Sequence, residues 1–236
     1  MTTQDSNGRG IVPGIDAPAP PPAPMLMKAV EQMKPVRMRS RFGAFAIVLV
    51  AGLIWPVVTM LIKPLRRDMV GLPRAWVVTG AVLWGAAFVL SLAAALIPRK
   101  GDVLPGAGRS SRVSFVAMLI VFLFALFFTV DVPGLSLTPA DKGWTLFDSC
   151  LHCIGFVFRV SGVLLLVGFL ALRRLAPVGA RRIGMSLGAA GGALGGLTLH
   201  FLCPFASTDH VVLSHVGGMV LAAAAGAALL PSLIER

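Results

Sequence analysis

The sequence predicts an all-α, polytopic membrane protein with six transmembrane helices. Its 236 residues are 56% hydrophobic and only 13% charged, with a mean hydropathy of +0.85, whereas soluble domains are roughly 45–50% apolar and about 25% charged. A helix needs a run of roughly 20 apolar residues to cross a bilayer. Lipid cannot satisfy the backbone of an open sheet, so every such run is predicted to be helical. The runs are 42–62, 75–97, 113–130, 154–172, 183–203 and 211–230.

Two segments precede the first run. Residues 1–24 are rich in Pro, Gly and Ala and lack the apolar stretch of a signal peptide, so they are predicted to be a disordered cytoplasmic tail. Residues 25–41 are predicted to be a cytoplasmic juxtamembrane segment, and residues 42–236 the transmembrane domain. Within the juxtamembrane segment, a short helix would place Leu26, Val30 and Met33 on one face. The alternative is a segment that lies on the lipid surface.

The basic residues predict the orientation of the helices. Of the 21 Lys and Arg residues, 15 lie in the two tails and in the second and fourth loops. Five lie in the first and third loops, and Arg159 lies inside the fourth run. The positive-inside rule therefore predicts cytoplasmic termini in a multi-pass protein of the bacterial inner membrane. This distribution and anionic lipid also explain the net charge of +11, so no direct binding of nucleic acid is expected.

Every cysteine and histidine falls in two short stretches, both at the predicted outer face. The first stretch lies directly before the fourth run, and the second extends from the end of the fifth run into the sixth. Thiolates and imidazoles carry out redox chemistry and bind soft or borderline metals. The stretches contain Cys150, His152 and Cys153, and then His200, Cys203, His210 and His215.

Three interpretations of these residues stay open. An oxidising outer compartment permits a disulfide between Cys203 and either Cys150 or Cys153. Zn or Cu binding is the second interpretation, and packing within the membrane is the third. We expect Cys150, Cys153 and Cys203 to act as redox or sensor residues. The residues proposed as metal ligands are His152, His200, Cys203, His210 and His215. His200 and His210 are expected to be the imidazoles nearest to Cys203.

Small residues predict close packing of the last two helices. Gly188, Gly192 and Gly196 recur at spacing four in the fifth run, and the sixth run is rich in Ala. Such residues let helix backbones approach closely in lipid. We therefore expect a tight hairpin of these two helices, with a homodimer as the lesser option. Arg159 is either a functional intramembrane charge or a side chain that extends to the outer face.

The sequence lacks the motifs of the common membrane enzymes. It has no phosphate-binding Gly-rich loop, no HExxH motif and no pair of acids suited to acid–base catalysis. We therefore predict no catalytic residues and a protein that is not an enzyme. The alternatives are a thiol oxidoreductase, in which Cys150 and Cys153 exchange with Cys203, and a metal-handling membrane protein.

The pattern resembles the NrsF-type negative regulators of extracytoplasmic-function sigma factors, which are six-helix anti-sigma factors of the inner membrane. The resemblance covers roughly residues 25–234. It rests on the basic segment 34–41 (KPVRMRSR), a cysteine at the outer start of the fourth helix, and a Gly/Ala-rich fifth helix that ends in 199–204 (LHFLCP). Histidines and a small-residue last helix follow.

The resemblance implies a membrane sensor that holds an extracytoplasmic-function sigma factor through its cytoplasmic N-terminal region. Its periplasmic cysteines would correspond to Cys203 and to either Cys150 or Cys153. We expect Leu26, Val30 and Met33 to anchor the sigma factor, while Arg37 and Arg39 face its acidic surface. The predicted function is an anti-sigma factor that responds to a periplasmic redox or metal signal.

Overall fold

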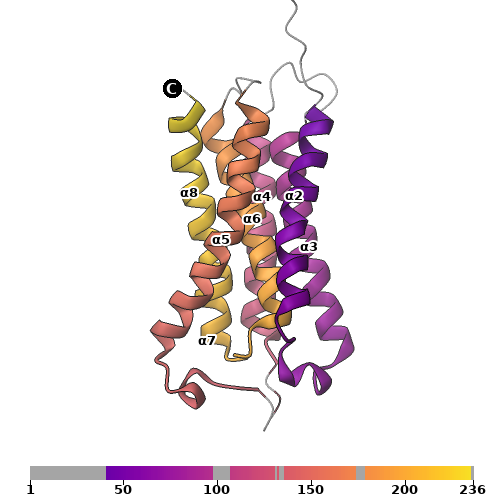
Figure 1. The fold of residues 1–236 in the computed structure, drawn as a ribbon, viewed down its shortest axis with the longest axis vertical. Helices are drawn as coiled ribbons and strands as arrows, with labels where there is room; N and C mark the ends of the chain where they lie inside the picture. Colours follow the sequence, from indigo (N-terminus) through magenta and orange to yellow (C-terminus); the bar gives the residue numbers. More distant parts are fainter. Residues whose placement is uncertain (1–40, 98–106, 131, 133–135, 174–178, 235–236) are drawn as a thin grey trace, which may run out of the picture. The chain divides into compact units, whose positions relative to one another are not determined.

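The computed structural model describes residues 41–97, 107–130, 132, 136–173 and 179–234, and the positions below refer to these residues. Six helices in this part of the chain are long and apolar enough to cross a membrane (Figure 1). The first five are α2 (Arg41–Ile62), α3 (Arg74–Leu96), α4 (Ala107–Phe128), α5 (Leu146–Leu172) and α6 (Ala180–Leu202). The sixth runs continuously through α7 (Thr208–His210), the π-helical turn η3 (Val211–Val216) and α8 (Gly217–Ile234). Two short 3₁₀ turns lie between the long helices, η1 (Arg67–Val70) and η2 (Pro139–Lys142).

Helix α6 occupies the centre of the bundle. It contacts all five of the other long helices, and these follow one another around it in the order α8, α5, α2, α3 and α4. In its most apolar stretch 78% of the residues are buried, against 22–39% in the other five helices. A central helix with neighbours on every side needs small side chains, which explains its Gly-rich sequence.

The three glycines that recur at spacing four in α6 face two different helices. A side chain at Gly188 would overlap the backbone carbonyl of Ala222 in α8, and one at Gly192 would lie 2.5 Å from the Met219 Cα of the same helix. A side chain at Gly196 would instead overlap the ring of Trp84 in α3. The expected tight packing of the last two helices is therefore confirmed. Gly196 belongs to a different interface from Gly188 and Gly192, although the three share a spacing of four.

The helices begin earlier than hydropathy alone predicts. Helix α4 starts at Ala107 and includes Arg109 and Arg112, which lie outside the apolar run. Helix α5 starts at Leu146 because Thr145 and Asp148 form a capping box there. Capping chemistry thus adds turns that an average over apolar residues excludes.

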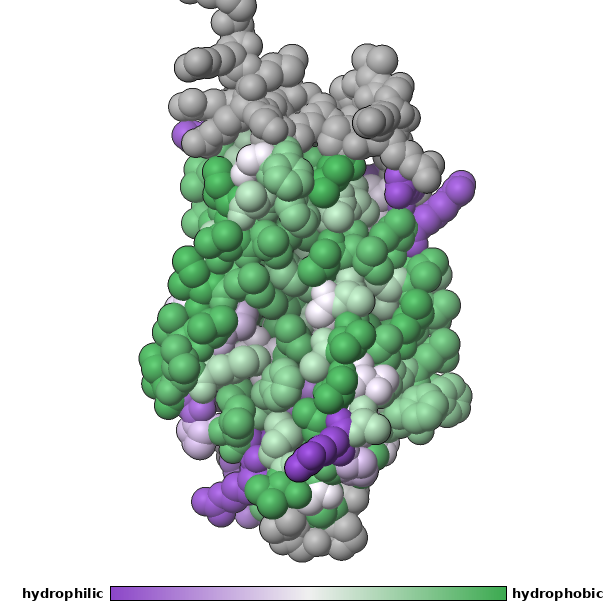
Figure 2. All heavy atoms as spheres, turned by 90° about the vertical axis from the view of Figure 1, so that its right-hand side faces the viewer, coloured by the Kyte–Doolittle hydropathy of each residue, from purple (hydrophilic) through white to green (hydrophobic). Residues whose placement is uncertain are grey.

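The outer surface of the bundle is apolar over its middle. Figure 2 shows a nearly continuous hydrophobic surface on one face, with hydrophilic residues gathered toward the ends. Large apolar side chains are exposed on several helices, among them Leu61 (81%), Phe115 (62%) and Phe127 (70%). Soluble monomers rarely expose contiguous apolar surface on this scale, so the fold fits a lipid environment.

Candidate functional site

The candidate site lies where α5, α6 and the α7–η3 segment meet, at the end of the bundle that carries η1 and η2 (Figure 1). The capping box starts α5 just before its cysteines. Pro204 cannot continue α6, which leaves Cys203 as the C-cap residue. The next helix begins after Ser207 and turns back into the bundle. Four residues have ligand atoms within 4.8 Å of one another and form what we call the Cys/His cluster: Cys153, Cys203, His210 and His215.

The Cys/His cluster is compact and buried. The Sγ atoms of Cys153 and Cys203 lie 3.8 Å apart, and Cys203 Sγ lies 3.5 Å from His210 Nε2. The exposed fractions of the four residues are 0–4%. A disulfide would require a separation of about 2.05 Å, so the three cysteines are free thiols. The pair selected by the fold is Cys153 with Cys203, not Cys150 with Cys203.

A π-helical turn brings the two histidines of the cluster together. In an α-helix, residues five apart point to different faces, because one turn takes 3.6 residues. The turn η3 has the wider i→i+5 pattern, and the rings of His210 and His215 stand 5.8 Å apart, centroid to centroid. His215 therefore joins the cluster, although its spacing from His210 gave no reason to expect this. Turns of this type are frequent at functional sites.

Hydrogen bonds fix the orientation of the His210 ring. The Ser149 hydroxyl donates to the Leu146 carbonyl at 2.8 Å, so its oxygen is available to accept from His210 Nδ1 at 3.0 Å. This arrangement leaves the Nε2 lone pair directed at Cys203. Cys150 Sγ lies 3.9 Å from Nδ1, on the opposite side of the ring from Cys203. Cys150 thus touches the cluster without belonging to it.

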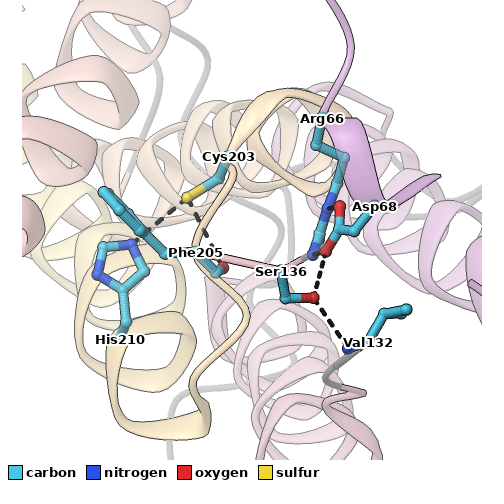
Figure 3. Close-up of polar contacts among 7 residues, drawn as sticks. All are labelled: Arg66, Asp68, Val132, Ser136, Cys203, Phe205 and His210. Carbon is cyan, nitrogen blue, oxygen red and sulfur yellow. Dashed lines mark hydrogen bonds and ion pairs between the residues drawn. The ribbon is translucent and has the colours of Figure 1, made fainter. Parts of the chain in front are cut away.

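Two loops enclose the turn that carries Cys203 (Figure 3). In the first, Arg66 binds Asp68 through two side-chain hydrogen bonds, and the Arg66 amide donates to the Phe201 carbonyl at 3.0 Å. In the second, Ser136 donates to Asp68 at 2.7 Å and accepts from the Val132 amide. We call Arg66, Asp68 and Ser136 the loop latch. Burial opposes ionisation of Asp68, but the hydrogen bonds from Arg66 and Ser136 outweigh it and lower its pKa.

The turn itself is tied to the second loop. The Leu137 amide donates to the Pro204 carbonyl at 3.2 Å, and Leu137 forms an isolated bridge with Phe205. The Phe205 ring in turn packs against His210, with centroids 4.9 Å apart. Displacement of Cys203 would therefore disturb contacts with both loops.

The expectation that His200 is one of the two imidazoles nearest to Cys203 is wrong, because this residue lies outside the Cys/His cluster. Its ring packs on Trp76, with centroids 4.6 Å apart, and its Nε2 lies 3.2 Å from the Val77 carbonyl. A side chain at Gly80 would overlap this ring. Gly80 thus makes room for the His200 ring against α3. The histidine that lies beside His210 in the cluster is His215.

The remaining predicted residues lie apart from the cluster. His152 is exposed and packs against Trp144, with centroids 5.5 Å apart. Arg159 is exposed on α5. The expected partner-binding residues lie outside the part of the chain that the structure describes, and these are Leu26, Val30, Met33, Arg37 and Arg39.

Sequence reasoning missed Ser149 and the loop latch. The sequence places Ser149 directly before Cys150, so its position beside the cysteines was visible, but its contact with His210 depends on the return of the last helix. The residues of the latch are 68 positions apart at the closest cross-loop contact. No local sequence pattern predicts the contact between Asp68 and Ser136.

A cavity of about 120 Å³ reaches the cluster from the loops. Cys153 and Cys203 lie on its wall, together with His152, Lys63 and Lys142. A smaller cavity of about 20 Å³ touches His215 and His200 from the side of α3 and α4. The cluster is thus enclosed by protein, with a narrow approach to the two thiols.

Comparison with known families gives one match. The family model described as "NrsF: Negative regulator of sigma F" matches residues 30–235, which covers the six helices and every residue of the cluster. No curated protein and no solved structure matches the chain. Because the matched range includes most of the sequence, the chain belongs to the NrsF family of negative regulators of sigma F.

Proposed function

We propose that this negative regulator is an anti-sigma factor of the bacterial inner membrane. It holds an extracytoplasmic-function sigma factor on the cytoplasmic side and releases it when a redox or metal event alters the Cys/His cluster on the periplasmic side. Family membership supports a sigma factor as the partner. The observation that carries the sensor is the buried convergence of two thiols and two imidazoles from three helices.

The distribution of basic residues supports this sidedness. Fifteen of the 21 lie in the tails and in the second and fourth loops, whereas five lie in the first and third loops, which contain η1 and η2 at the end that holds the cluster. The thiols would then face an oxidising compartment, where redox changes of cysteine persist. The N-terminal segment would face the cytoplasm, where a sigma factor is available.

The packing of α6 supports a route between the two ends. Near the cluster, α6 ends at Cys203. At its other end, Ser186 shares hydrogen bonds with Ser110 and Ser114 of α4. Between them, Gly184 and Gly188 let the backbone of α6 pack directly against the backbone of α8. A changed bond at Cys203 would therefore act on a helix that is closely packed along its length. A shift of α6 regulates the sigma factor only if the two arrangements differ in sigma affinity.

The burial of the thiols speaks against an oxidoreductase. Cys150, Cys153 and Cys203 are 7%, 4% and 2% exposed, whereas exchange with a protein substrate needs an accessible thiolate. Of the possible cysteine pairs, Cys153 and Cys203 are the two whose sulfur atoms are in contact.

Co-purification with a sigma factor tests the proposal. The double variant Leu26→Asp with Val30→Asp should release the sigma factor and raise transcription of its regulon, because charged groups replace two apolar anchors. The matched control is Ile11→Asp with Val12→Asp, two equally apolar residues of the predicted tail 1–24, which should retain full capture. If deletion of residues 1–35 leaves both sigma capture and transcription of the regulon unchanged, the proposed anti-sigma function is contradicted.

A further inference from the structure

Two distances in the Cys/His cluster agree with the edges of a metal tetrahedron. Zn–S bonds of about 2.3 Å and Zn–N bonds of about 2.05 Å give edges of about 3.8 Å between two sulfurs and about 3.5 Å between a sulfur and a nitrogen. The structure has 3.8 Å between Cys153 Sγ and Cys203 Sγ and 3.5 Å between Cys203 Sγ and His210 Nε2. These two edges join three of the four ligand atoms, and all four atoms lie within 4.8 Å of one another.

The orientation of the histidines is a second and independent observation. Ser149 occupies Nδ1 of His210, which leaves the unprotonated Nε2 facing the thiols. His215 is 3% exposed, and its buried Nε2 has no hydrogen-bond partner among the described residues. Buried polar nitrogens are nearly always paired. A dithiol alone uses neither of these features, whereas a bound cation accounts for a buried His215 Nε2 that lacks a hydrogen-bond partner.

We propose that Cys153, Cys203, His210 and His215 bind one divalent cation of the Zn²⁺ type in a tetrahedral S₂N₂ site. Charge balance favours a divalent ion. Two thiolates neutralise its charge of +2 and the imidazoles are neutral, so no net charge is buried in the apolar surroundings. A monovalent Cu⁺ would leave a net negative charge buried there. The ligand types also suit Zn²⁺.

The site would act as a clamp on three helices. Its ligands come from α5, the end of α6 and the helix that contains η3. Occupancy would hold these helices in one relation, and loss of the cation would free them. This regulatory meaning rests on the proposed function, whereas binding of the cation does not.

The test is a titration of the full-length protein in detergent micelles with a non-chelating reductant. Co²⁺ serves as the probe, because thiolate ligation and tetrahedral geometry both appear in its absorption spectrum, and Zn²⁺ should displace it. We expect one equivalent per chain. Loss of a residue that only hydrogen-bonds to a metal ligand typically weakens metal binding by roughly 10–100-fold. Cys153→Ser and His210→Ala each remove a ligand, so each should weaken Co²⁺ binding by more than this.

Matched controls lie beside each ligand. Cys150→Ser and His152→Ala change the same residue types outside the set of four and should bind Co²⁺ like the unchanged protein. His215→Cys keeps four ligands, so it should retain binding with a stronger thiolate band, which a merely misfolded variant could not show. Equal loss of binding in Cys150→Ser, an octahedral spectrum without a thiolate band, or no uptake would each overturn the site.

The two proposals fail separately. Sigma capture that persists in a protein without cation binding would leave the anti-sigma function standing and remove the metal site. A stoichiometric tetrahedral cation in a protein that captures no sigma factor would do the reverse.

Discussion

Replacement of Gly188 by alanine should separate the last helix from α6. The added Cβ would overlap the Ala222 carbonyl and lie 2.9 Å from the Ala223 Cα. Both neighbours are backbone atoms, so neither can rotate away. The second distance is about 0.5 Å short of the 3.4 Å at which ordinary contact begins. The two helices must therefore move apart.

The expected cost is that of an overpacked interior, about 1–3 kcal/mol. The same displacement should carry His210 away from Cys203, since His210 belongs to the displaced helix. Two alanine controls test whether the effect is specific. Gly155 on α5 has no atom within 4 Å of the added Cβ, and Gly217 has its nearest neighbour at 3.7 Å.

The assay is unfolding of the purified protein in mild detergent. Gly188→Ala should lower the stability, whereas Gly155→Ala and Gly217→Ala should not. A Gly188→Ala protein as stable as the two controls would refute the idea that backbone contact sets the α6–α8 distance.

Three other predictions concern the loops at the cluster end of the bundle. Asp68→Asn should destabilise the fold by roughly 3–5 kcal/mol, because it leaves the buried Arg66 cation unpaired. The folded-state pKa of Asp68 is lowered, so the contribution of its carboxylate to stability should be complete above its ordinary pKa of about 4. This contribution should be lost as the pH falls through the folded-state pKa. Unfolding curves of Asp68→Asn should therefore lack this dependence of stability on pH. A reporter enzyme fused after Lys142 or after Ala206 should be active only if it is one that works in the periplasm. Activity of a reporter that works in the cytoplasm, at either position, would contradict the predicted orientation. Anionic thiol reagents should modify Cys153 faster than cationic ones of the same size, because Lys63 and Lys142 line its cavity, and Lys142→Gln should narrow that ratio.

The number of helices could be predicted from the sequence because apolar length is a local property. The beginnings of the helices were less predictable. The capping box at Thr145 and Asp148 is itself a local signal, and hydropathy alone underestimated α5. Close packing of α6 on the last helix also followed from small residues at regular spacing, although Gly196 proved to serve Trp84.

The composition of the site was harder to predict. The two cysteines of α5 are three residues apart, and both lie on the buried side of the helix. Only the position of the neighbouring helices brings Cys153 next to Cys203 and puts Cys150 next to the far side of the His210 ring. The place of His215 inside the cluster depends on a π-helical turn, and the place of His200 outside it depends on the space at Gly80. Neither feature has a reliable sequence signal.

The central claim is that the Cys/His cluster controls release of the sigma factor. The most direct measurement is transcription of the sigma regulon in cells that carry the unchanged protein, Cys203→Ser or Cys150→Ser, each with and without a thiol oxidant or added Zn²⁺. Sigma capture by each variant is measured in parallel. We predict that Cys203→Ser alters the response to the signal while it still captures the sigma factor, and that Cys150→Ser responds like the unchanged protein. A Cys203→Ser protein with an unaltered response to both treatments would contradict the account.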